Sequence, residues 1–242
     1  MGTWGIIPAA GSGTRIQPLA FSKELLPVGS LRSGGVERPR AICEYLIERM
    51  ALAGVEKINL IVSPGKWDIL RYFGNGTGDV RICYTVQHQP SGLCDAIFCA
   101  LPFIDRDDRV VVGLPDTVWF PSDGLKYLPH DKLAFLLFPV DKPEFYDAVE
   151  TGDNGEVRKI YVKQRGLSGL WIWGAFSMPG HVFHEIYRLW SIREPRDEYF
   201  GTLVNVYIEN GGEAAGVRAG ESYVDVGTLN GYREAMRLLS GG

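Results

Sequence analysis

Short apolar runs alternate with amphipathic segments along the first half of the chain. Residues 3–9 read TWGIIPA and residues 57–63 read KINLIVS; both are short, apolar and bounded by turn-forming residues, which predicts buried strands. Between them, residues 41–54 place apolar side chains at helical spacing, and Gly54 is a natural C-terminal stop. The chain therefore begins as strand, helix and strand.

The same alternation continues to about residue 116. It predicts, in order, a helix over 66–74, a strand over 80–86, a helix over 92–103 and a strand over 108–116. Repeated β-α-β units favour a parallel sheet with helices on both faces. Sites in such sheets lie at the carboxyl ends of the strands, where Asp116 and the glycine-rich stretch after the first strand are expected.

From about Lys132 the pattern loosens. It predicts a strand over 133–140, a hairpin over 148–163, a strand over 169–178, helices over 180–190 and 198–212, a strand over 221–227 and a helix over 230–239. No internal repeat, low-complexity tract or long linker interrupts the chain. We therefore predict an α/β fold with three αβα layers, Rossmann-like, in which a mostly parallel mixed central sheet forms part of a single domain.

Composition narrows the class of protein. The 242 residues are 45% hydrophobic and 22% charged, and the net charge of −4 argues against a general binder of nucleic acids or membrane surfaces. No stretch has the length of a membrane span, and the N-terminus lacks the pattern of a signal peptide. The four cysteines form no CxxC pair and have apolar neighbours, which indicates free thiols in a reducing compartment. We expect a cytoplasmic protein with no nucleic-acid or membrane partner.

The stretch after the first strand, AAGSGTRIQPLAFSK, differs from the two best-known phosphate loops. A Rossmann fingerprint needs a third glycine where Ile16 stands, and the GK[ST] end of a Walker A loop is absent. Pro18 makes it difficult for a helix to begin here. The sequence therefore predicts a long, wrapped loop.

Two glycines and two cations in this loop suggest an anionic ligand. Gly11 and Gly13 would let backbone N–H groups approach an oxyanion closely. Arg15 and Lys23 would add formal charge where a polyphosphate lies. The alternative is a plain surface turn with solvated cations.

The stretch GSGTRIQPLAFSKELLPVG resembles the GxGTR signature of the nucleotidyltransferases that make nucleoside-diphosphate sugars, especially glucose-1-phosphate thymidylyl- and uridylyltransferases. Ser22 departs from it, because a proline is common before the lysine. Three further segments are similar to the family's motifs: VQHQPSGLCDAI, GLPDTVW and YVDVGTLNGYREA. The resemblance implies a nucleotidyltransferase domain over 1–242, in which 1–131 bind the nucleotide and 132–242 bind the acceptor.

The family's activity would be transfer of a nucleoside monophosphate from a nucleoside triphosphate, dTTP or UTP favoured, to a sugar 1-phosphate with release of pyrophosphate. The resemblance implies catalytic roles for Arg15, Lys23 and Asp116. It implies nucleotide-binding roles for Ala9, Ala10, Gly11, Gly13, Thr14, Gln87 and Gly92. A glutamine amide both donates and accepts, which suits the edge of a pyrimidine.

The meeting of two anionic substrates calls for Mg²⁺, which prefers a few carboxylates, water and phosphate oxygens. By resemblance, Asp116 and Asp225 hold it, although each alone could be a turn-forming aspartate. The implied acceptor-binding residues are Tyr146, Lys163, Gly174 and Glu198. Lys163 alone could be a solvated strand-end lysine, and Glu198 could equally be the dipole partner of a helix N-terminus.

Two positions depart from the glucose-1-phosphate pattern. Relatives usually carry a glutamate where this chain has Val162, and a glycine where it has Asp147. Losing a carboxylate that binds hydroxyls changes discrimination strongly, so another acceptor stays open. A cytidylyltransferase acting on a phosphorylated alcohol or polyol, and a non-catalytic regulatory module that binds nucleotides, are the alternatives.

The segment SLRSGGVERPRAI is longer and more basic than the family's usual link into the helix. Its arginines, Arg32, Arg38 and Arg40, would reach a second phosphate or an acidic acceptor; the alternative is a flexible surface loop. The sequence leaves a homo-oligomeric assembly open.

Overall fold

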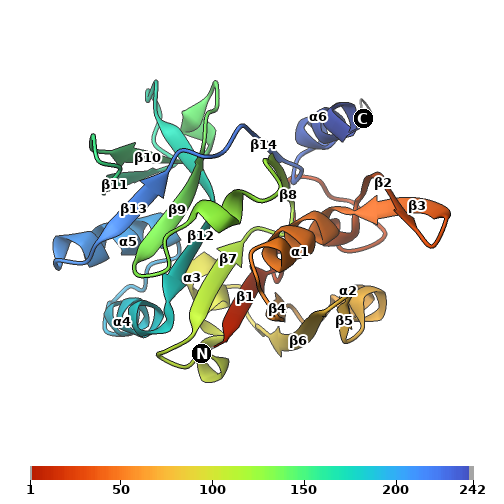
Figure 1. Ribbon diagram of the computed structural model, residues 1–242, viewed down its shortest axis with the longest axis horizontal. Helices are drawn as coiled ribbons and strands as arrows, with labels where there is room; N and C mark the ends of the chain where they lie inside the picture. Colours follow the sequence, from red (N-terminus) through yellow and green to blue (C-terminus); the bar gives the residue numbers. More distant parts are fainter. Residues whose placement is uncertain (1, 240–242) are drawn as a thin grey trace.

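A ten-stranded mixed sheet runs through the centre of the computed structural model, which describes residues 2–239 (Figure 1). Its main path has the order β11-β10-β12-β7-β1-β4-β6-β5, and β9 pairs with both β12 and β13. The strands are β1 (Thr3–Pro8), β4 (Lys57–Val62), β5 (Gly76–Thr77), β6 (Val80–Val86), β7 (Arg109–Gly113), β9 (Leu133–Phe138), β10 (Asp147–Thr151), β11 (Val157–Val162), β12 (Trp171–Pro179) and β13 (Ala214–Val217).

The first half of the chain builds the parallel part of this sheet. β1 pairs in parallel with β4 and with β7, and β4 pairs in parallel with β6. The second half joins through β12, which runs antiparallel to β7 and to β9. The carboxyl ends of β1, β4, β6 and β7 therefore meet at one edge, as the sequence predicts.

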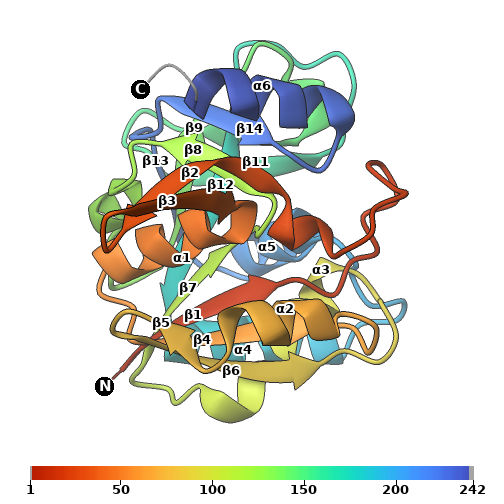
Figure 2. The same ribbon diagram turned by 90° about the vertical axis from the view of Figure 1, so that its right-hand side faces the viewer.

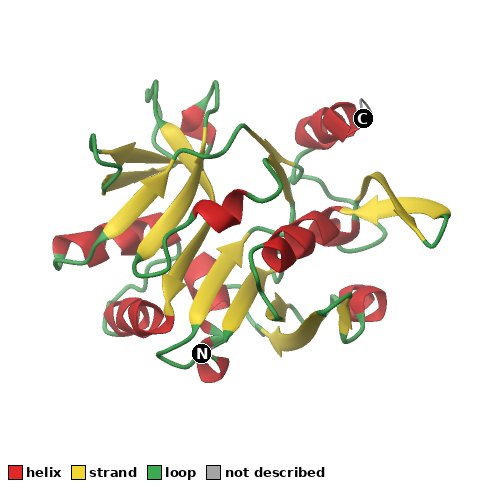
Figure 3. Cartoon of the chain, in the orientation of Figure 1, coloured by secondary structure: helices red, strands yellow, loops and turns green. Residues whose placement is uncertain are grey.

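Helices cover both faces of the sheet (Figure 3). They are α1 (Ile42–Leu52), α2 (Trp67–Phe73), α3 (Leu93–Phe98), α4 (Gly180–Ser191), α5 (Phe200–Glu209) and α6 (Leu229–Leu239). Consecutive residues of β1 face opposite ways: Ile6 packs with α3, α4 and α5, whereas Ile7 packs with α1 and α2. The three-layer α/β fold predicted from the sequence is confirmed.

Two small sheets flank the main one. β8 (Thr117–Phe120) pairs antiparallel with β14 (Ser222–Asp225), and β2 (Pro27–Ser33) pairs antiparallel with β3 (Val36–Ala41). A separate apolar cluster joins both to α6 through side chains such as Val28, Val118 and Val224. Figure 2 shows α6 and β14, the last elements of the chain, close to β8 and β2.

The expected elements are present with ends shifted by a few residues. The structure adds five strands that the sequence does not predict, namely β2, β3, β5, β8 and β13. Residues 30–42, for which a flexible loop was an alternative, belong mainly to the β2–β3 hairpin. The four cysteines are free thiols, as predicted. No helix within residues 2–239 combines the length and apolar character needed to cross a membrane.

Candidate active site

The glycine loop folds back on itself after β1. Ala9 and Ala10 are buried, and the Ala9 N–H donates to the carbonyl of Ile61 at 2.7 Å, which continues the alignment of β1 with β4. Gly13 has a φ of +66°, and a Cβ there would lie only 2.7 Å from Cδ of Lys23. Gly13 is thus required both by its backbone conformation and by the close approach of the lysine stem. The long wrapped loop predicted from the sequence is present.

Each cation of the loop lies against a carboxylate. Nζ of Lys23 donates to Oδ2 of Asp116 at 2.6 Å, and Nη1 of Arg15 donates to Oδ2 of Asp225 at 2.8 Å. Burial lowers the pKa of Lys23, but the charge of Asp116, the hydrogen bond to it and the charges of Glu24 and Asp225 together outweigh burial, so the pKa is raised. Lys23 is therefore protonated at neutral pH. The Arg15 side chain is 60% exposed, so its guanidinium remains open to solvent.

Asp116 and Asp225 come together although they are far apart in sequence. The β8–β14 ladder sets Asp225 opposite Thr117, and the Val226 N–H donates to the Asp116 carbonyl at 2.8 Å. A Cβ at Gly227 would lie 2.9 Å from Oδ2 of Asp116 and 2.9 Å from Oδ1 of Asp225. The two carboxylates thus flank a small space that only glycine leaves free.

This pair of carboxylates fits the donor set of Mg²⁺. Magnesium is commonly bound by one or two protein carboxylates, with water and substrate phosphates completing its octahedron. Among residues 2–239, no group of three or more His, Cys, Asp or Glu side chains is arranged to hold a metal ion. An ion between Asp116 and Asp225 would thus take further oxygen ligands from substrate and water.

Gln87 and Gly92 lie at the carboxyl end of β6 and the start of α3. The buried side-chain amide of Gln87 donates to the carboxylate of Asp95, which fixes its orientation. Gly92 has a φ of +94°, and a Cβ there would lie 2.7 Å from Cα of Glu198. The carbonyl of Glu198 accepts from the Leu93 N–H at 2.8 Å, so the main chain at Glu198 caps the start of α3. The structure therefore brings Gly92 and Glu198, two expected site residues, together through the backbone.

Tyr146 and Gly174 approach the carboxylates through Tyr223. A Cβ at Gly174 would lie 2.6 Å from the Phe138 ring and 2.7 Å from the Tyr223 ring. The edge of Tyr146 packs against Tyr223 with ring centroids 5.7 Å apart. Burial raises the pKa of Tyr146, and the negative charge of Asp225 adds to that shift. Both residues thus lie on the Asp225 side of the site.

Lys163 adopts an unusual backbone conformation at the end of β11. Its φ is +47°, a region that costs a non-glycine residue free energy and is often retained at functional sites. Nζ donates to the hydroxyl of Tyr199 at 3.3 Å and lies 4.4 Å from the centre of its ring. Tyr199 directly follows Glu198, so Lys163 contacts the neighbour of another expected acceptor residue.

Asp147 and Val162, the two departures from the family pattern, are directly paired across the β10–β11 ladder. Burial raises the pKa of Asp147, with the charge of Lys163 acting in the opposite direction. A carboxylate thus lies opposite Val162 on the neighbouring strand.

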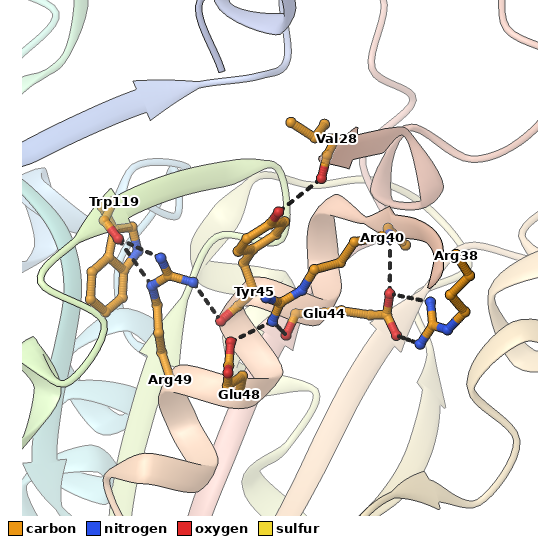
Figure 4. Close-up of polar contacts among 9 residues, drawn as sticks. Val28, Arg38, Arg40, Glu44, Tyr45, Glu48, Arg49 and Trp119 are labelled. Atoms are coloured by element: carbon orange, nitrogen blue, oxygen red, sulfur yellow. Dashed lines mark hydrogen bonds and ion pairs between the residues drawn. The ribbon is translucent and has the colours of Figure 1, made fainter. Parts of the chain in front are cut away.

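The three arginines of the β2–β3 hairpin are paired with glutamates rather than left open, and Figure 4 shows this for Arg38 and Arg40. Arg38 donates to both carboxylate oxygens of Glu44, at 3.0 and 2.6 Å, and Arg40 pairs with Glu48. Arg32 lies 3.5 Å from Glu37 within the hairpin. These contacts do not support the expectation that the three arginines reach a second phosphate.

Sequence reasoning missed several charged residues that support the site. Arg49, only 2% exposed, donates to the carbonyls of Trp119 and Tyr45 and so ties α1 to β8 (Figure 4). The side chains of Lys66, just before α2, and Asp68, within α2, contact the glycine loop and the residue that follows it. The departure at Ser22 was the available signal for Asp68, because Ser22 donates to it from both its N–H and its hydroxyl, and proline has neither donor.

Comparison with known proteins shows which proteins this chain is similar to. A family model described as nucleotidyl transferase matches residues 4–241. A glucose-1-phosphate thymidylyltransferase of Mycobacterium tuberculosis is 30% identical over 246 residues, which cover 96% of this chain and 80% of the relative. The UTP–glucose-1-phosphate uridylyltransferase AglF of Haloferax volcanii is 26% identical over 242 residues, covering 97% and 95% of the two chains.

Solved structures are similar in fold. A Bacillus anthracis protein in complex with sucrose has a TM-score of 0.82 at 23% identity, covering 98% of this chain and 95% of its own. The UTP-bound UGPase from Acinetobacter baumannii has a TM-score of 0.80 at 20% identity, with 98% and 93% covered. At these identities the likeness establishes a common fold.

Proposed function

The chain belongs to the nucleotidyl transferase family, and from that premise we propose that it transfers a nucleoside monophosphate from dTTP or UTP to a sugar 1-phosphate. Pyrophosphate and a nucleoside-diphosphate sugar are the products. The observation that carries the proposal is the convergence of Lys23–Asp116 and Arg15–Asp225 around Gly227, beside the glycine loop. The names of the thymidylyl- and uridylyltransferase relatives support the choice of nucleotide and acceptor.

In the proposed reaction, an oxygen of the acceptor phosphate attacks the α-phosphorus in line. The bond between the α-phosphorus and its bridging oxygen breaks, and pyrophosphate leaves with that electron pair. The attacking oxygen is already anionic, so the protein needs to position the reactants and stabilise charge rather than form a covalent intermediate. We assign Lys23 and Arg15 to hold the triphosphate and to stabilise the charge on the leaving pyrophosphate.

We assign Asp116 and Asp225 as the residues that would hold Mg²⁺. When bound, the ion reduces the repulsion between the two anionic substrates and polarises phosphoryl oxygens. The support for this assignment is the pair of carboxylate oxygens that flank Gly227.

The remaining expected residues divide between the two substrates. We assign the backbone of the glycine loop to the triphosphate and Gln87 with Gly92 to the base. The assigned loop residues are Ala9, Ala10, Gly11, Gly13 and Thr14. The acceptor is assigned to Tyr146, Lys163, Gly174 and Glu198, which lie in the second half of the chain.

Asp147 bears on the choice of acceptor. Because it is paired with Val162, it supplies a carboxylate on the strand next to the one where glucose-1-phosphate enzymes usually carry their glutamate. A displaced carboxylate still favours a hydroxyl-rich acceptor, since hydroxyl groups donate to it. This supports a sugar 1-phosphate whose hydroxyl pattern differs from that of glucose.

Pyrophosphate release across a matrix of substrates tests the proposal. The purified protein is mixed with Mg²⁺, one of dTTP, UTP, CTP or GTP, and one of several sugar 1-phosphates or phosphorylated polyols. We expect release only with dTTP or UTP and a sugar 1-phosphate. Release with CTP and a polyol phosphate alone would replace the proposal with the cytidylyltransferase alternative. Tight binding of nucleotide without any release would favour a regulatory module.

A further inference from the structure

The residues on both sides of Lys23 are held from the same neighbouring element. Ser22 donates to Asp68 from its N–H and its hydroxyl, each at 2.6 Å. Glu24 accepts from Nζ of Lys66 at 2.7 Å. Lys66 directly precedes α2 and Asp68 is its second residue, so one short segment grips the chain immediately before and after Lys23.

Lys66 also holds the other end of the glycine loop. Its Nζ donates to the carbonyl of Ala9 at 2.6 Å, just after β1 ends. The Ala9 N–H donates to the carbonyl of Ile61, so both backbone polar groups of Ala9 are hydrogen-bonded. One ammonium group therefore ties the first residue of the loop to Glu24, where the loop ends.

The Lys66–Glu24 ion pair is buried, although neither residue has an assigned chemical role. Glu24 is 1% exposed, and its second carboxylate oxygen is buried without a described partner. Burial raises the pKa of Glu24, while the charge of Lys66 opposes that shift. Buried ion pairs often contribute little net stability compared with apolar side chains of similar volume. Stability alone therefore gives a poor account of why two charges are buried here.

A role in positioning Lys23 explains the buried Lys66–Glu24 ion pair better. Its stem packs against Gly13, and its ammonium group lies 2.6 Å from Asp116. A lysine has a long, flexible side chain, so the position of its ammonium group depends on how firmly its backbone is held. With Ser22 and Glu24 both fixed, the Lys23 backbone has little freedom to turn.

We propose that Lys66 and Asp68 form a clamp that positions Lys23 and the glycine loop for the triphosphate. This inference rests on the proposed function. Lys66 and Asp68 are positioning residues, because their contacts are to Ala9 at the start of the glycine loop and to the neighbours of Lys23.

A double variant separates positioning from stability. Glu24→Leu with Lys66→Met replaces the buried ion pair by hydrocarbon, which avoids leaving one charge buried alone. We expect cooperative thermal unfolding to persist while kcat/KM for the triphosphate falls at least tenfold. KM for the sugar phosphate should stay within twofold of the wild-type value. The matched control is Arg38→Met with Glu44→Leu. It removes the ion pair between β3 and α1 and should keep wild-type kcat/KM.

A single variant tests the other arm of the clamp. Asp68→Asn keeps the shape of the side chain and removes its charge, and we expect kcat to fall at least threefold. If the double variant does not fold, Asp68→Asn decides alone. Wild-type kcat/KM in the folded double variant, or wild-type kcat in Asp68→Asn, would overturn the clamp.

Calorimetry of UTP binding in the presence of Mg²⁺ distinguishes failure of the clamp from failure of the proposed function. If the wild-type protein binds UTP but releases no pyrophosphate with any acceptor, the proposed function fails. The clamp would then still require at least tenfold weaker UTP binding in the folded double variant, or in Asp68→Asn if the double variant does not fold. Unchanged binding there would overturn it.

Discussion

The candidate active site contains two ion pairs between cations of the glycine loop and strand-end aspartates. Lys23 is held against Asp116 in a largely buried setting, whereas Arg15 reaches Asp225 from solvent. A screened, exposed pair contributes little by itself, but a cation in a buried setting interacts more strongly with an incoming anion. We therefore expect Lys23 to matter more than Arg15 to the reaction.

Removing the Lys23 ammonium should reduce turnover. Lys23→Ala leaves Asp116 without its cation and takes positive charge from the triphosphate site, so we expect kcat to fall well over tenfold. Circular dichroism and thermal unfolding should show an intact fold. Pyrophosphate release measures the effect, and turnover close to wild type would remove Lys23 from the mechanism.

Gly227 tests the space between the carboxylates. Gly227→Ala would place a methyl group 2.9 Å from oxygens of both Asp116 and Asp225. Because that space is assigned to the metal, we expect turnover at a fixed Mg²⁺ concentration to fall at least tenfold, with partial recovery as Mg²⁺ is raised. An Mg²⁺ titration of initial rates measures this. An unchanged Mg²⁺ dependence would contradict the assignment.

At the scale of elements, the site depends on how β8 is held. The β8–β14 ladder sets Asp116 beside Asp225, and Arg49 of α1 donates to the Trp119 carbonyl within β8. Burial lowers the pKa of Arg49 to about 10, so it is still charged at neutral pH without a carboxylate bonded to it. Its contribution is to the main chain of β8 rather than to an ion pair.

Arg49→Met should weaken this connection. The change leaves the Trp119 and Tyr45 carbonyls without a donor, so we expect the free energy of unfolding to fall by about 2–4 kcal/mol. Urea denaturation at pH 7 measures the loss. A variant as stable as wild type would show that water or a relaxed backbone satisfies these carbonyls.

The link between the β2–β3 hairpin and α1 should depend on pH. Burial raises the pKa of Glu44, but hydrogen bonds from Arg38 and from the Ala41 N–H outweigh it, so the pKa lies below its ordinary value of 4.5. The unfolded chain therefore binds a proton first, and Glu44 stabilises the fold above pH 4.5 but less as the pH falls through its folded pKa.

Glu44→Gln isolates this contribution. We expect the variant to be less stable than wild type by about 1–2 kcal/mol at pH 7, and the difference to shrink below pH 4.5. Chemical denaturation at several pH values measures it. A difference that is constant down to pH 3.5 would contradict a role for the ionised carboxylate.

The sequence predicts elements well where the apolar pattern is strong, and poorly where tertiary contacts decide. β13 reads AAGV, which has little intrinsic strand preference and is held by pairing with β9. The β2–β3 hairpin contains prolines and arginines, and it is fixed by glutamates on α1 that no local pattern associates with it. β8 directly follows Pro115 and Asp116, so the sequence pattern does not separate it from the preceding strand and its loop.

At the scale of the whole molecule, motifs indicated which residues matter but not how they meet. The spacing between Asp116 and Asp225 says nothing about distance; the β8–β14 ladder supplies it. The pairing of Asp147 with Val162 depends on hairpin register. Lys66 and Asp68 belong to no motif, so only the structure relates them to Lys23. Cytoplasmic location and oligomeric state stay predictions.

We propose that both halves of the chain act on one reaction, the transfer of a nucleoside monophosphate to a sugar 1-phosphate. The most direct measurement follows UTP and dTTP labelled at the α-phosphate together with pyrophosphate release. We predict that label enters a nucleoside-diphosphate sugar in one-to-one ratio with pyrophosphate, only when sugar 1-phosphate and Mg²⁺ are present. Pyrophosphate formed without acceptor, or no labelled nucleoside-diphosphate sugar with any sugar 1-phosphate, would contradict it.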